Sequence, residues 1–446
     1  MQQQVNNQQM LDALVSNLRA SGLKTKLLFT LAMIALFRFG AQLPIYGINN
    51  EAFMQMAAGN NMIGFLDLFS GGALGKVSIF ALGIGPYITS SIIMQLLAVI
   101  IPYLEKLQKE EGEAGRRKIQ QITRQFAVIL ALFQSFVFVT ILSKLPGTIV
   151  HEVSPMMFFI GSMAALTAGS AFVMWLAELI TEKGVGNGGS LIIFIGIISG
   201  IPLYAKNTKT ILSDSALILP FLILMAIFIA TIVFIIIFHD AVRKVPIVSA
   251  RRQVGNKVYG GANTNIPFKL NPGGVMPIIF AVAILLFPAT ILSFAQQMSV
   301  KEGVLRQALE WFSYIFSPAS PAYYVIYFLL IVGLTFFYAS IIPSMQPKEI
   351  ANNLKKYGSA IPGVKPGMPT SEKLNEILSR TILIGAVSLG VIALIPTVAS
   401  KLTNITTLQG LGATSLIIMV GVALDFVNQI KTHLYAKNYE SFLKQQ

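Results

Sequence analysis

Long apolar stretches, each near the length that crosses a bilayer as a helix, recur along this chain of 446 residues. A spanning helix needs about 20 apolar residues, and a bilayer requires backbone polar groups to bond internally. With 54% hydrophobic and 12% charged residues, the chain has too little polar surface to cover a soluble fold. The sequence predicts an all-α polytopic membrane protein with ten transmembrane helices. The expected spans are 25–44, 77–102, 123–143, 155–180, 189–205, 215–239, 273–296, 320–343, 377–398 and 413–431.

The stretch from Phe69 to Leu97 interrupts its own helical pattern with several glycines and a proline. We expect a short amphipathic helix that breaks within 71–75, followed by a long apolar helix that carries Gly83, Gly85 and Pro86. The short piece cannot cross a bilayer, so it can enter the membrane only where protein surrounds it or where it lines a cavity. Broken helices of this kind build paths and gates. A re-entrant or surface loop before an ordinary span is the alternative.

The charge of the chain is unevenly distributed. Lysine and arginine number 33 against 19 acidic residues, which gives a net charge of +14. If both termini and every second loop lie on one side of the membrane, most of the basic residues gather there. The positive-inside rule then places both termini in the cytoplasm, which requires an even number of spans. The N-terminal segment MQQQVNNQQM lacks the charged region and cleavage site of a signal peptide.

The sequence offers no residue set that predicts catalysis or a metal site. It has no cysteine, and His151, His239 and His433 fall in separate loops or helix ends. The segment GVGNGG at 184–189 satisfies the dinucleotide spacing G-x-G-x-x-G. It joins two expected spans instead of a strand and a helix, which favours a tight turn between packed helices. We therefore expect a protein that is not an enzyme and needs no metal or cofactor.

Seven short motifs follow one another along the chain in a distinctive order. They are FSGGAL at 69–74, SIFALGIGPYI at 78–88, KEEGEAGRRKI at 109–119, GVGNGGSLIIF at 184–194, NPGGVMPIIFA at 271–281, PKEIANNLKKYGSAIPGVKPG at 347–367 and ATSLIIMVGVALDF at 413–426. Their order and spacing resemble the SecY family, the pore subunits of bacterial protein-translocation channels. This resemblance covers nearly the whole chain and implies a protein-conducting channel.

The resemblance implies two pseudo-symmetric inverted five-helix halves with a short plug helix. Spans 2 and 7 would correspond in the two halves, and both are interrupted by glycine and proline. The implied parts are a cytoplasmic N-terminal segment at 1–24, an N-terminal half at 25–205, a C-terminal half at 206–431 and a cytoplasmic tail at 432–446. Two long cytoplasmic loops, 240–272 and 344–376, combine an apolar core with flanking basic residues, which indicates ordered hairpin-like projections.

A pore ring and a plug are implied at named positions. In this family one ring of isoleucines closes the channel at the midplane, although isoleucine pairs at helical spacing are commonplace in membrane helices. Gly189 departs from the family's bulky aliphatic residue, so either the constriction is wider there or Ile192 fills the gap. The ring positions are Ile84, Ile88, Gly189, Ile193, Ile279 and Ile418. The plug positions are Gly64, Phe65, Leu66, Asp67, Leu68, Phe69, Ser70, Gly71, Gly72, Ala73 and Leu74.

The resemblance also implies a lateral gate and a docking surface. The gate would open between spans 2 and 7, although ordinary helix packing uses the same small and weakly polar residues. Positive-inside bias alone could explain the basic loops, and Lys365 replaces the family's arginine, which loses the bidentate fork. The gate positions are Thr89, Ile92, Gln95, Val282, Ala283 and Phe287. The docking positions are Arg243, Lys244, Arg251, Arg252, Lys257, Lys348, Lys355, Lys356 and Lys365.

The implied partners are a small single-span SecE-like subunit, a SecG-like subunit, a SecA-like motor ATPase, the ribosome through rRNA phosphates, signal-sequence-bearing preproteins and the lipid bilayer. The implied location is the plasma (inner) membrane. The alternative is a secondary transporter of small solutes, which also uses inverted repeats and broken helices. Such transporters place ionisable residues near the midplane. This chain has few within its expected spans, and Arg38, Glu178 and Asp425 are the clearest.

Overall fold

The computed structural model describes the chain at residues 22–50, 53, 67, 70–109, 112–144, 147–149, 154–211, 215–249, 252–254, 257–259, 263–297, 307, 311–312, 314–316, 320–342, 345–403 and 413–443. Its helices are α2 (Leu23–Gly40), α5 (Gly85–Ile100), α6 (Pro102–Lys109), α7 (Gly112–Lys144), α8 (Pro155–Lys183), α9 (Gly188–Ile211), α10 (Ser215–Asp240), α11 (Met276–Gln297), α13 (Pro321–Ile341), α14 (Pro347–Lys356), α15 (Met368–Thr403) and α16 (Ala413–Leu443). Its strands are β1 (Val242–Ser249), β2 (Arg252–Val254), β3 (Lys257–Tyr259), β4 (Asn263–Lys269) and β5 (Ser359–Ala360).

Several of these helices are long and apolar enough to cross a membrane. Within the described residues six qualify, in α7, α8, α10, α13, α15 and α16. A seventh arises if α5 and α6, which meet at 104°, count as one bent span, and the apolar parts of α9 and α11 are shorter. The prediction of a helical membrane protein with several spans is confirmed. The number ten and the inverted halves remain predictions.

Two of the spans begin at a Ser-Pro pair. At α8 the Ser154 hydroxyl accepts a hydrogen bond from the Met157 N–H at 3.3 Å, and at α13 Ser320 does the same for Ala322 at 3.1 Å. The following proline, Pro155 or Pro321, has no N–H to satisfy and a backbone angle suited to the first helical turn. These local signals explain why both predicted starts lie within one residue of the observed ones.

The second span begins later than predicted. Residues 77–84 are as apolar as a helix, but they form turns, and α5 starts only at Gly85 with Pro86 in its first turn. Ile45 N–H donates to the Val77 carbonyl and Ile79 N–H to the Leu43 carbonyl, both at 3.0 Å. Backbone groups that pair with residues 43–45 are not available to an uninterrupted helix. The prediction that Gly83 lies inside this helix is therefore wrong.

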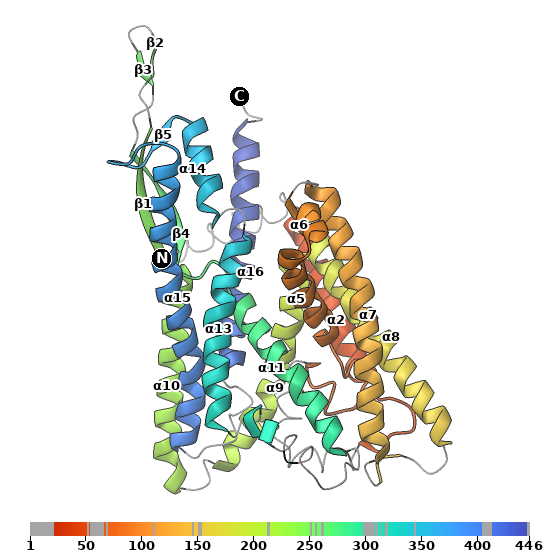
Figure 1. Ribbon diagram of the computed structural model, residues 1–446. Coiled ribbons are helices and arrows are strands. Elements are labelled where there is room, and N and C mark those ends of the chain that lie inside the picture. The colour runs from red at the N-terminus through yellow and green to blue at the C-terminus, as the bar shows by residue number, and fades with distance from the viewer. Residues whose placement is uncertain are drawn as a thin grey trace, which may run out of the picture. The chain divides into compact units, whose positions relative to one another are not determined.

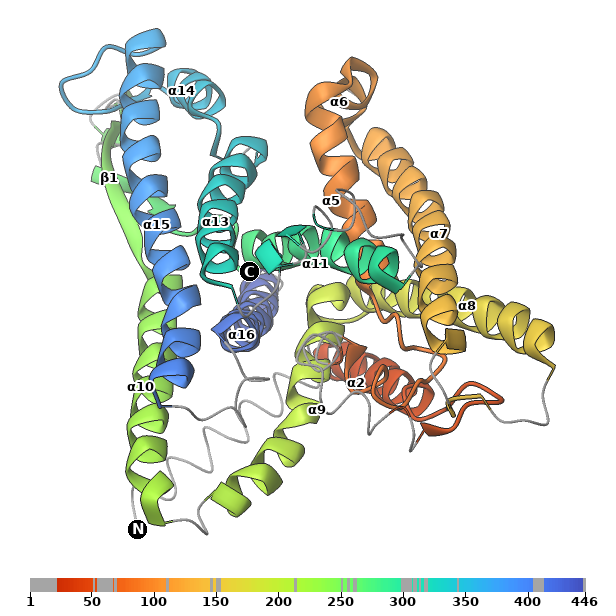
Figure 2. The ribbon, with the colours of Figure 1, turned by 60° about the horizontal axis from the view of Figure 1, so that its bottom comes forward.

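The chain divides into two compact units, and the first comprises Met1–Thr210, Leu286–Ser317 and Val422–Gln446. Within it α7 packs against α5 and α8, and α6 folds back at the end of α5 to cover α7 (Figure 2). An apolar core joins α7 and α8 to the turns before α5. Its buried residues are Ile45, Phe53, Leu74, Val77, Ala81, Val139, Leu142, Phe158 and Leu166.

The second unit comprises Ile211–Leu285 and Pro318–Gly421. Its long helix α15 packs against α10, α13 and α14. At one end of α15 strand β1 pairs antiparallel with β4, from Val242 opposite Lys269 to Val248 opposite Asn263 (Figure 1). Strand β5 pairs with the other edge of β1, and β2 with β3 forms a short antiparallel ladder.

The sheet of the second unit rests on a small apolar core. Buried residues from β1, β4, α13, α14 and α15 share this core, which fixes the loops 240–272 and 344–376 against the helices. Its members are Val245, Phe268, Ala339, Ala351, Leu354, Ile361, Leu374, Leu378 and Ile382. Among the described residues, the first loop is an ordered hairpin of β1 and β4, as predicted, whereas the second forms α14, β5 and the start of α15. The strands are an addition to the otherwise helical fold. The boundary between the two implied halves remains a prediction.

Candidate functional site

Two predicted ring positions of the first unit lie against each other. Ile84 is the residue before α5 and is 1% exposed, and Gly189 is in the first turn of α9. A Cβ atom on Gly189 would lie 3.4 Å from Ile84 Cδ1 and 3.3 Å from Asn187 Oδ1. The Ile84 side chain therefore occupies the space beside Gly189. Ile193, one turn further along α9, is also 1% exposed, whereas Ile88 on α5 is half-buried.

The predicted plug is described at Asp67 and from Ser70 onward, and Gly64, Phe65, Leu66, Leu68 and Phe69 lie outside the described residues. The Asp67 carboxylate accepts a hydrogen bond from the Gly75 N–H at 2.6 Å and from the Ser70 hydroxyl at 3.2 Å. The Ser70 oxygen in turn accepts from Leu74 N–H at 2.9 Å. Burial raises the pKa of the Asp67 carboxyl, against the opposing effects of these hydrogen bonds and of the nearby Lys76 charge. The segment is thus a tightly bonded turn.

One carbonyl of this turn is held by two helices. Arg38 Nη1 on α2 donates a hydrogen bond to the Gly71 oxygen at 2.6 Å, and Ser199 Oγ on α9 donates to the same oxygen at 3.2 Å. Gly71 has φ of +74°, a conformation that favours glycine. A Cβ there would lie only 3.1 Å from the Gly196 Cα on α9. Backbone therefore packs directly on backbone at this point.

Helix α9 contacts Ile84 and the plug segment through residues on one of its faces. Gly189, Ile193 and Gly196 are spaced by four and three residues, the spacing that keeps side chains on one side of an α-helix. Gly189 lies beside Ile84, and Gly196 lies beside Gly71 of the plug segment. Seven residues rise about 10 Å along a helix. The turn formed by Asp67 and residues 70–75, which we call the plug turn, and the Ile84 contact therefore lie along the same face of α9. They are separated by two turns of the helix.

The turn between α8 and α9 is fixed by side chains on three sides. Asn187 Oδ1 accepts from Ser190 N–H at 3.2 Å and begins α9, while Thr181 accepts from Gly188 N–H at 2.9 Å. Thr30 on α2 accepts from Val185 N–H at 3.0 Å. Gly186 adopts φ of +96°. The prediction that 184–189 forms a tight turn between packed helices is confirmed.

The ring positions of the second unit are buried beside the start of α11. Ile279 is 3% and Ile418 0% exposed. A Cβ on Gly421 of α16 would collide with the Val275 side chain, so the two backbones approach closely here. Ile279 follows Val275 by four residues and Ile418 precedes Gly421 by three, so both lie one turn from this contact. Ile279 and Ile418 of the second unit, like Ile84 and Ile193 of the first, thus lie in a packed interior.

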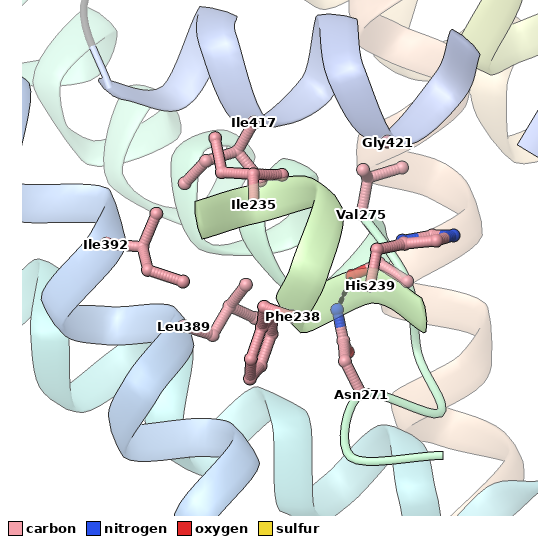
Figure 3. A pocket seen from close by; sticks show the side chains of 10 residues that line it. Ile235, Phe238, His239, Asn271, Val275, Leu389, Ile392, Ile417 and Gly421 are labelled. Atoms are coloured by element: carbon pink, nitrogen blue, oxygen red, sulfur yellow. Dashed lines mark hydrogen bonds between the residues drawn. The ribbon is translucent and has the colours of Figure 1, made fainter. Parts of the chain in front are cut away.

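The turn that begins α11 is stabilised by its own asparagine. Asn271, which is 7% exposed, donates a hydrogen bond from Nδ2 to the Gly274 carbonyl at 2.7 Å (Figure 3). A cavity of about 10 Å³, enough for one water molecule, lies next to it between α10, α15 and α16. Phe238 and Leu389 point into this region (Figure 3). This bonding sets where α11 starts and therefore the position of Ile279.

The hydrogen bonds of the predicted gate residues lie within a single helix. Ile92 and Val282 are buried, at 3% and 2% exposure. Thr89 donates to the Gly85 carbonyl at 3.1 Å and Gln95 to Ser91 at 3.3 Å, both within α5. Ala283 is half-buried, and the side chain of Phe287 lies outside the described residues. The gate assignment stays a prediction.

Most of the predicted docking residues lie on the surface of the second unit. Arg251 lies outside the described residues, and for Arg252 on β2 and Lys257 on β3 only the backbone is described. The other six surround the sheet and α14, above the core of Val245 and Leu354. All six are exposed: Arg243, Lys244, Lys348, Lys355, Lys356 and Lys365.

Sequence reasoning missed the residues that hold the plug turn. Arg38 stood out as a charge within an apolar span, but Gly71 lies 33 residues away, and nothing in the sequence joins them. Ser199 and Gly196 carried no signal of their own. Glu178, another charge within a span, bonds Gln120 at 3.2 Å and pairs with Arg124 at 3.4 Å. These two charges thus have structural partners within the first unit.

Comparison with known proteins identifies the family. A family model described as SecY matches residues 78–427. The protein translocase subunit SecY of Synechococcus elongatus is 45% identical over 438 residues, which cover 96% of this chain and 95% of the relative. That of Mycobacterium bovis is 39% identical over 453 residues, which cover 98% and 100%. The chain belongs to the SecY family.

Solved structures agree in fold. The structure described as a protein conducting channel matches with a TM-score of 0.67 at 17% identity and covers 92% of each chain. Sec61 in the canine ribosome-channel complex matches with a TM-score of 0.63 at 16% identity and also covers 92% of each. As a member of the SecY family, the protein is a multi-pass membrane subunit of a protein-conducting channel and not a catalytic enzyme. The resemblance drawn from the seven motifs is confirmed.

Proposed function

We propose that the protein is the pore-forming subunit of a Sec translocase in the plasma membrane. It passes unfolded secretory polypeptides across the membrane and releases signal sequences and membrane helices sideways into lipid. Ten spans form two inverted five-helix halves, 25–205 and 206–431, with both termini in the cytoplasm. The secondary-transporter alternative is not retained, because the chain belongs to the SecY family.

The observation that carries the proposal is the shared face of α9. Ile84 lies beside Gly189 at one end of this face, and the plug turn lies beside Gly196 two helical turns further. Helix α9 leaves the cytoplasm at Gly188, so the plug lies on the external side of the ring. A closed channel requires a constriction and a plug, and here both would lie along the same face of α9.

The ring works as an apolar gasket. An ion at a dry apolar constriction loses its hydration, which costs several kcal/mol, and apolar pores also close by expelling water. The aliphatic side chains of Ile84, Ile88, Ile193, Ile279 and Ile418 can part around an extended polypeptide without binding it. The closeness of Ile84 to Gly189 supports a ring in which the Ile84 side chain, instead of Ile192, compensates for the missing side chain of the glycine.

The exposed basic surface of the second unit suits large anionic partners. Lys355 and Lys356 lie in the last turn of α14, where cations also favour the negative end of the helix dipole. A ribosome presents rRNA phosphates, and a SecA-like motor ATPase presents a protein surface. Small SecE-like and SecG-like subunits complete the translocase. Structural neighbours that include a ribosome-channel complex support this assignment.

Reconstitution tests the transport function. The purified protein, with single-span accessory subunits in proteoliposomes, should import a denatured preprotein when a SecA-like motor and ATP are added. The matched control is the same preprotein without its signal sequence, which should stay outside. Uptake of small solutes driven by an ion gradient, with no protease-protected preprotein, would contradict the proposal.

A disulfide tests the lateral exit. Because the chain has no native cysteine, Thr89→Cys with Phe287→Cys introduces the one possible pair. A disulfide requires Cα atoms within about 7 Å, so crosslinking under mild oxidation reports that spans 2 and 7 meet. The locked channel should lose preprotein transport and regain it on reduction. Complete crosslinking with undiminished transport would place the gate elsewhere.

A further inference from the structure

We propose that Arg38 and Ser199 form a latch that holds the plug closed by binding the Gly71 carbonyl oxygen. We call these three residues the plug latch. This inference rests on the proposed role of residues 64–74 as a plug and deepens it, because it names the groups that set how easily the plug leaves. Both donors act as positioning residues for the channel's resting state.

The latch joins three separate parts of the first unit. The Gly71 oxygen accepts from Arg38 Nη1 at 2.6 Å and from Ser199 Oγ at 3.2 Å. The Ser199 hydroxyl also lies 2.6 Å from the Gly196 carbonyl of its own helix, so it shares its hydrogen between two acceptors. A hydrogen bond from a charged donor is roughly twice as strong as a neutral one. Arg38 is therefore the principal member and Ser199 the auxiliary one.

The position of Arg38 points to a role in the plug, and not in the helix that carries it. An arginine in an apolar span is costly and marks a functional site by default. Arg38 lies in the last turn of α2, where the helix dipole favours a cation. The acceptor of its hydrogen bond is nevertheless a carbonyl of another segment, 33 residues away. The charge therefore ties α2 to the plug.

The geometry of Gly71 makes this carbonyl available. Its left-handed backbone, with φ of +74°, turns the chain so that its Cα lies against Gly196 while its oxygen meets both donors. A plug that leaves this place must break both hydrogen bonds together. Water in the opened channel can then solvate the guanidinium, and so can any backbone carbonyl of a passing polypeptide. The latch thus stabilises the closed state, and in the open state water or a polypeptide carbonyl takes the place of the Gly71 oxygen as the partner of Arg38.

Resting ion conductance in planar bilayers tests the latch. Arg38→Gln should raise the conductance of the unoccupied channel about tenfold and Ser199→Ala about threefold, in line with the loss of a charged and a neutral hydrogen bond. Arg38→Lys keeps the charge and should give a smaller increase. The matched controls are Lys144→Gln, a basic residue in the last turn of α7, and Ser143→Ala, whose hydroxyl bonds Val139 in its own helix. Both should leave the conductance unchanged.

The same substitutions in a channel that lacks residues 64–74 separate the latch from the plug. Deletion alone should raise the conductance, and Arg38→Gln should then add nothing. If the deletion raises it while Arg38→Gln and Ser199→Ala do not, the latch is wrong and the plug stands. If the deletion has no effect, the plug assignment itself fails. An increase by Arg38→Gln on top of the deletion also overturns the latch. If Arg38→Gln does not fold, Arg38→Lys and Ser199→Ala give the same comparison.

Discussion

The plug latch and the basic surface around α14 use positive charge in opposite ways. In the first unit one arginine is bonded to a single backbone carbonyl at 2.6 Å, within an apolar helix. In the second unit Lys348, Lys355 and Lys356 extend into solvent from a short helix that is buried only through Ala351 and Leu354. The first arrangement fixes one internal geometry, whereas the second presents charge to a partner.

The difference sets how strongly each region should respond to mutation. The Arg38 side chain is half-buried and its charged hydrogen bond is the stronger of the two at Gly71, so its loss should change the closed state on its own. An exposed lysine is screened by salt and has neighbours of the same sign, so each one contributes little. Interior residues should therefore give large effects that are insensitive to salt, and surface residues should give small effects that depend on it.

The largest effect should follow from damage to the seal itself. We expect Ile84→Thr with Ile418→Thr, or deletion of residues 64–74, to raise resting conductance more than about tenfold, because polar side chains hold water in the constriction. The control is Ile129→Thr, which makes the same change on α7 at a side chain that is 62% exposed. Planar-bilayer recording decides the matter. If the resting conductance of the ring variant is no higher than that of Ile129→Thr, the ring does not seal the channel and interior residues do not have the large effects expected of them.

A smaller effect should distinguish the packing of Gly71 on α9 from the backbone strain that alanine would cause in the plug turn. Gly71 and Gly72 have nearly the same backbone, with φ of +74° and +78°, but only at Gly71 would an added Cβ atom have a neighbour within 4 Å. Alanine at either residue is strained. Gly71→Ala must also push against Gly196, so it should raise resting conductance above Gly72→Ala, by about fivefold for roughly 1 kcal/mol of lost packing. Equal conductance in the two variants would show that the α9 contact does not hold the plug.

The smallest effect per residue should come from the docking surface. Lys356→Glu with Lys365→Glu should weaken ribosome binding a few-fold at low salt, and the difference should shrink as salt rises. Lys144→Glu, on the predicted external side of the membrane, is the matched charge reversal and should have no effect. Sedimentation of the solubilised channel with ribosomes across a salt series measures this. If ribosome binding changes neither with salt nor with these substitutions, the docking surface does not bind the ribosome through its charge.

Local patterns predicted much of the fold. Apolar length placed the starts of the spans 155–180 and 320–343 within one residue of Pro155 and Pro321, where a Ser-Pro pair fixes each helix start through one hydrogen bond and one proline ring. The start of α5 was not predicted, because Val77 and Ile79 pair their backbone groups with Ile45 and Leu43 and the residues that follow bond in local turns. Apolarity alone cannot distinguish a helix from a buried turn when the deciding partner is more than thirty residues away.

The sequence named two positions that prove to be neighbours, but it did not reveal the residues that hold the plug segment. The motifs placed Ile84 and Gly189 in one ring, and the structure shows them adjacent. Arg38 was conspicuous as an intramembrane charge, yet its acceptor is a backbone carbonyl, which every residue has. No pattern of side chains can reveal such a partner. Only the folded path of residues 70–75 brings that particular carbonyl to α2 and α9.

The shared face of α9 also restricts how this part of the chain can change length. Inserting one residue between Gly189 and Gly196 would rotate the far end of the helix by about 100° relative to the near end. The plug would then meet a different side of α9 from the one that faces Ile84. Substitutions can be absorbed there one at a time, whereas a single insertion or deletion would break both contacts at once. Variation in length among related channels should therefore fall in the loops and leave residues 189–196 with a constant count.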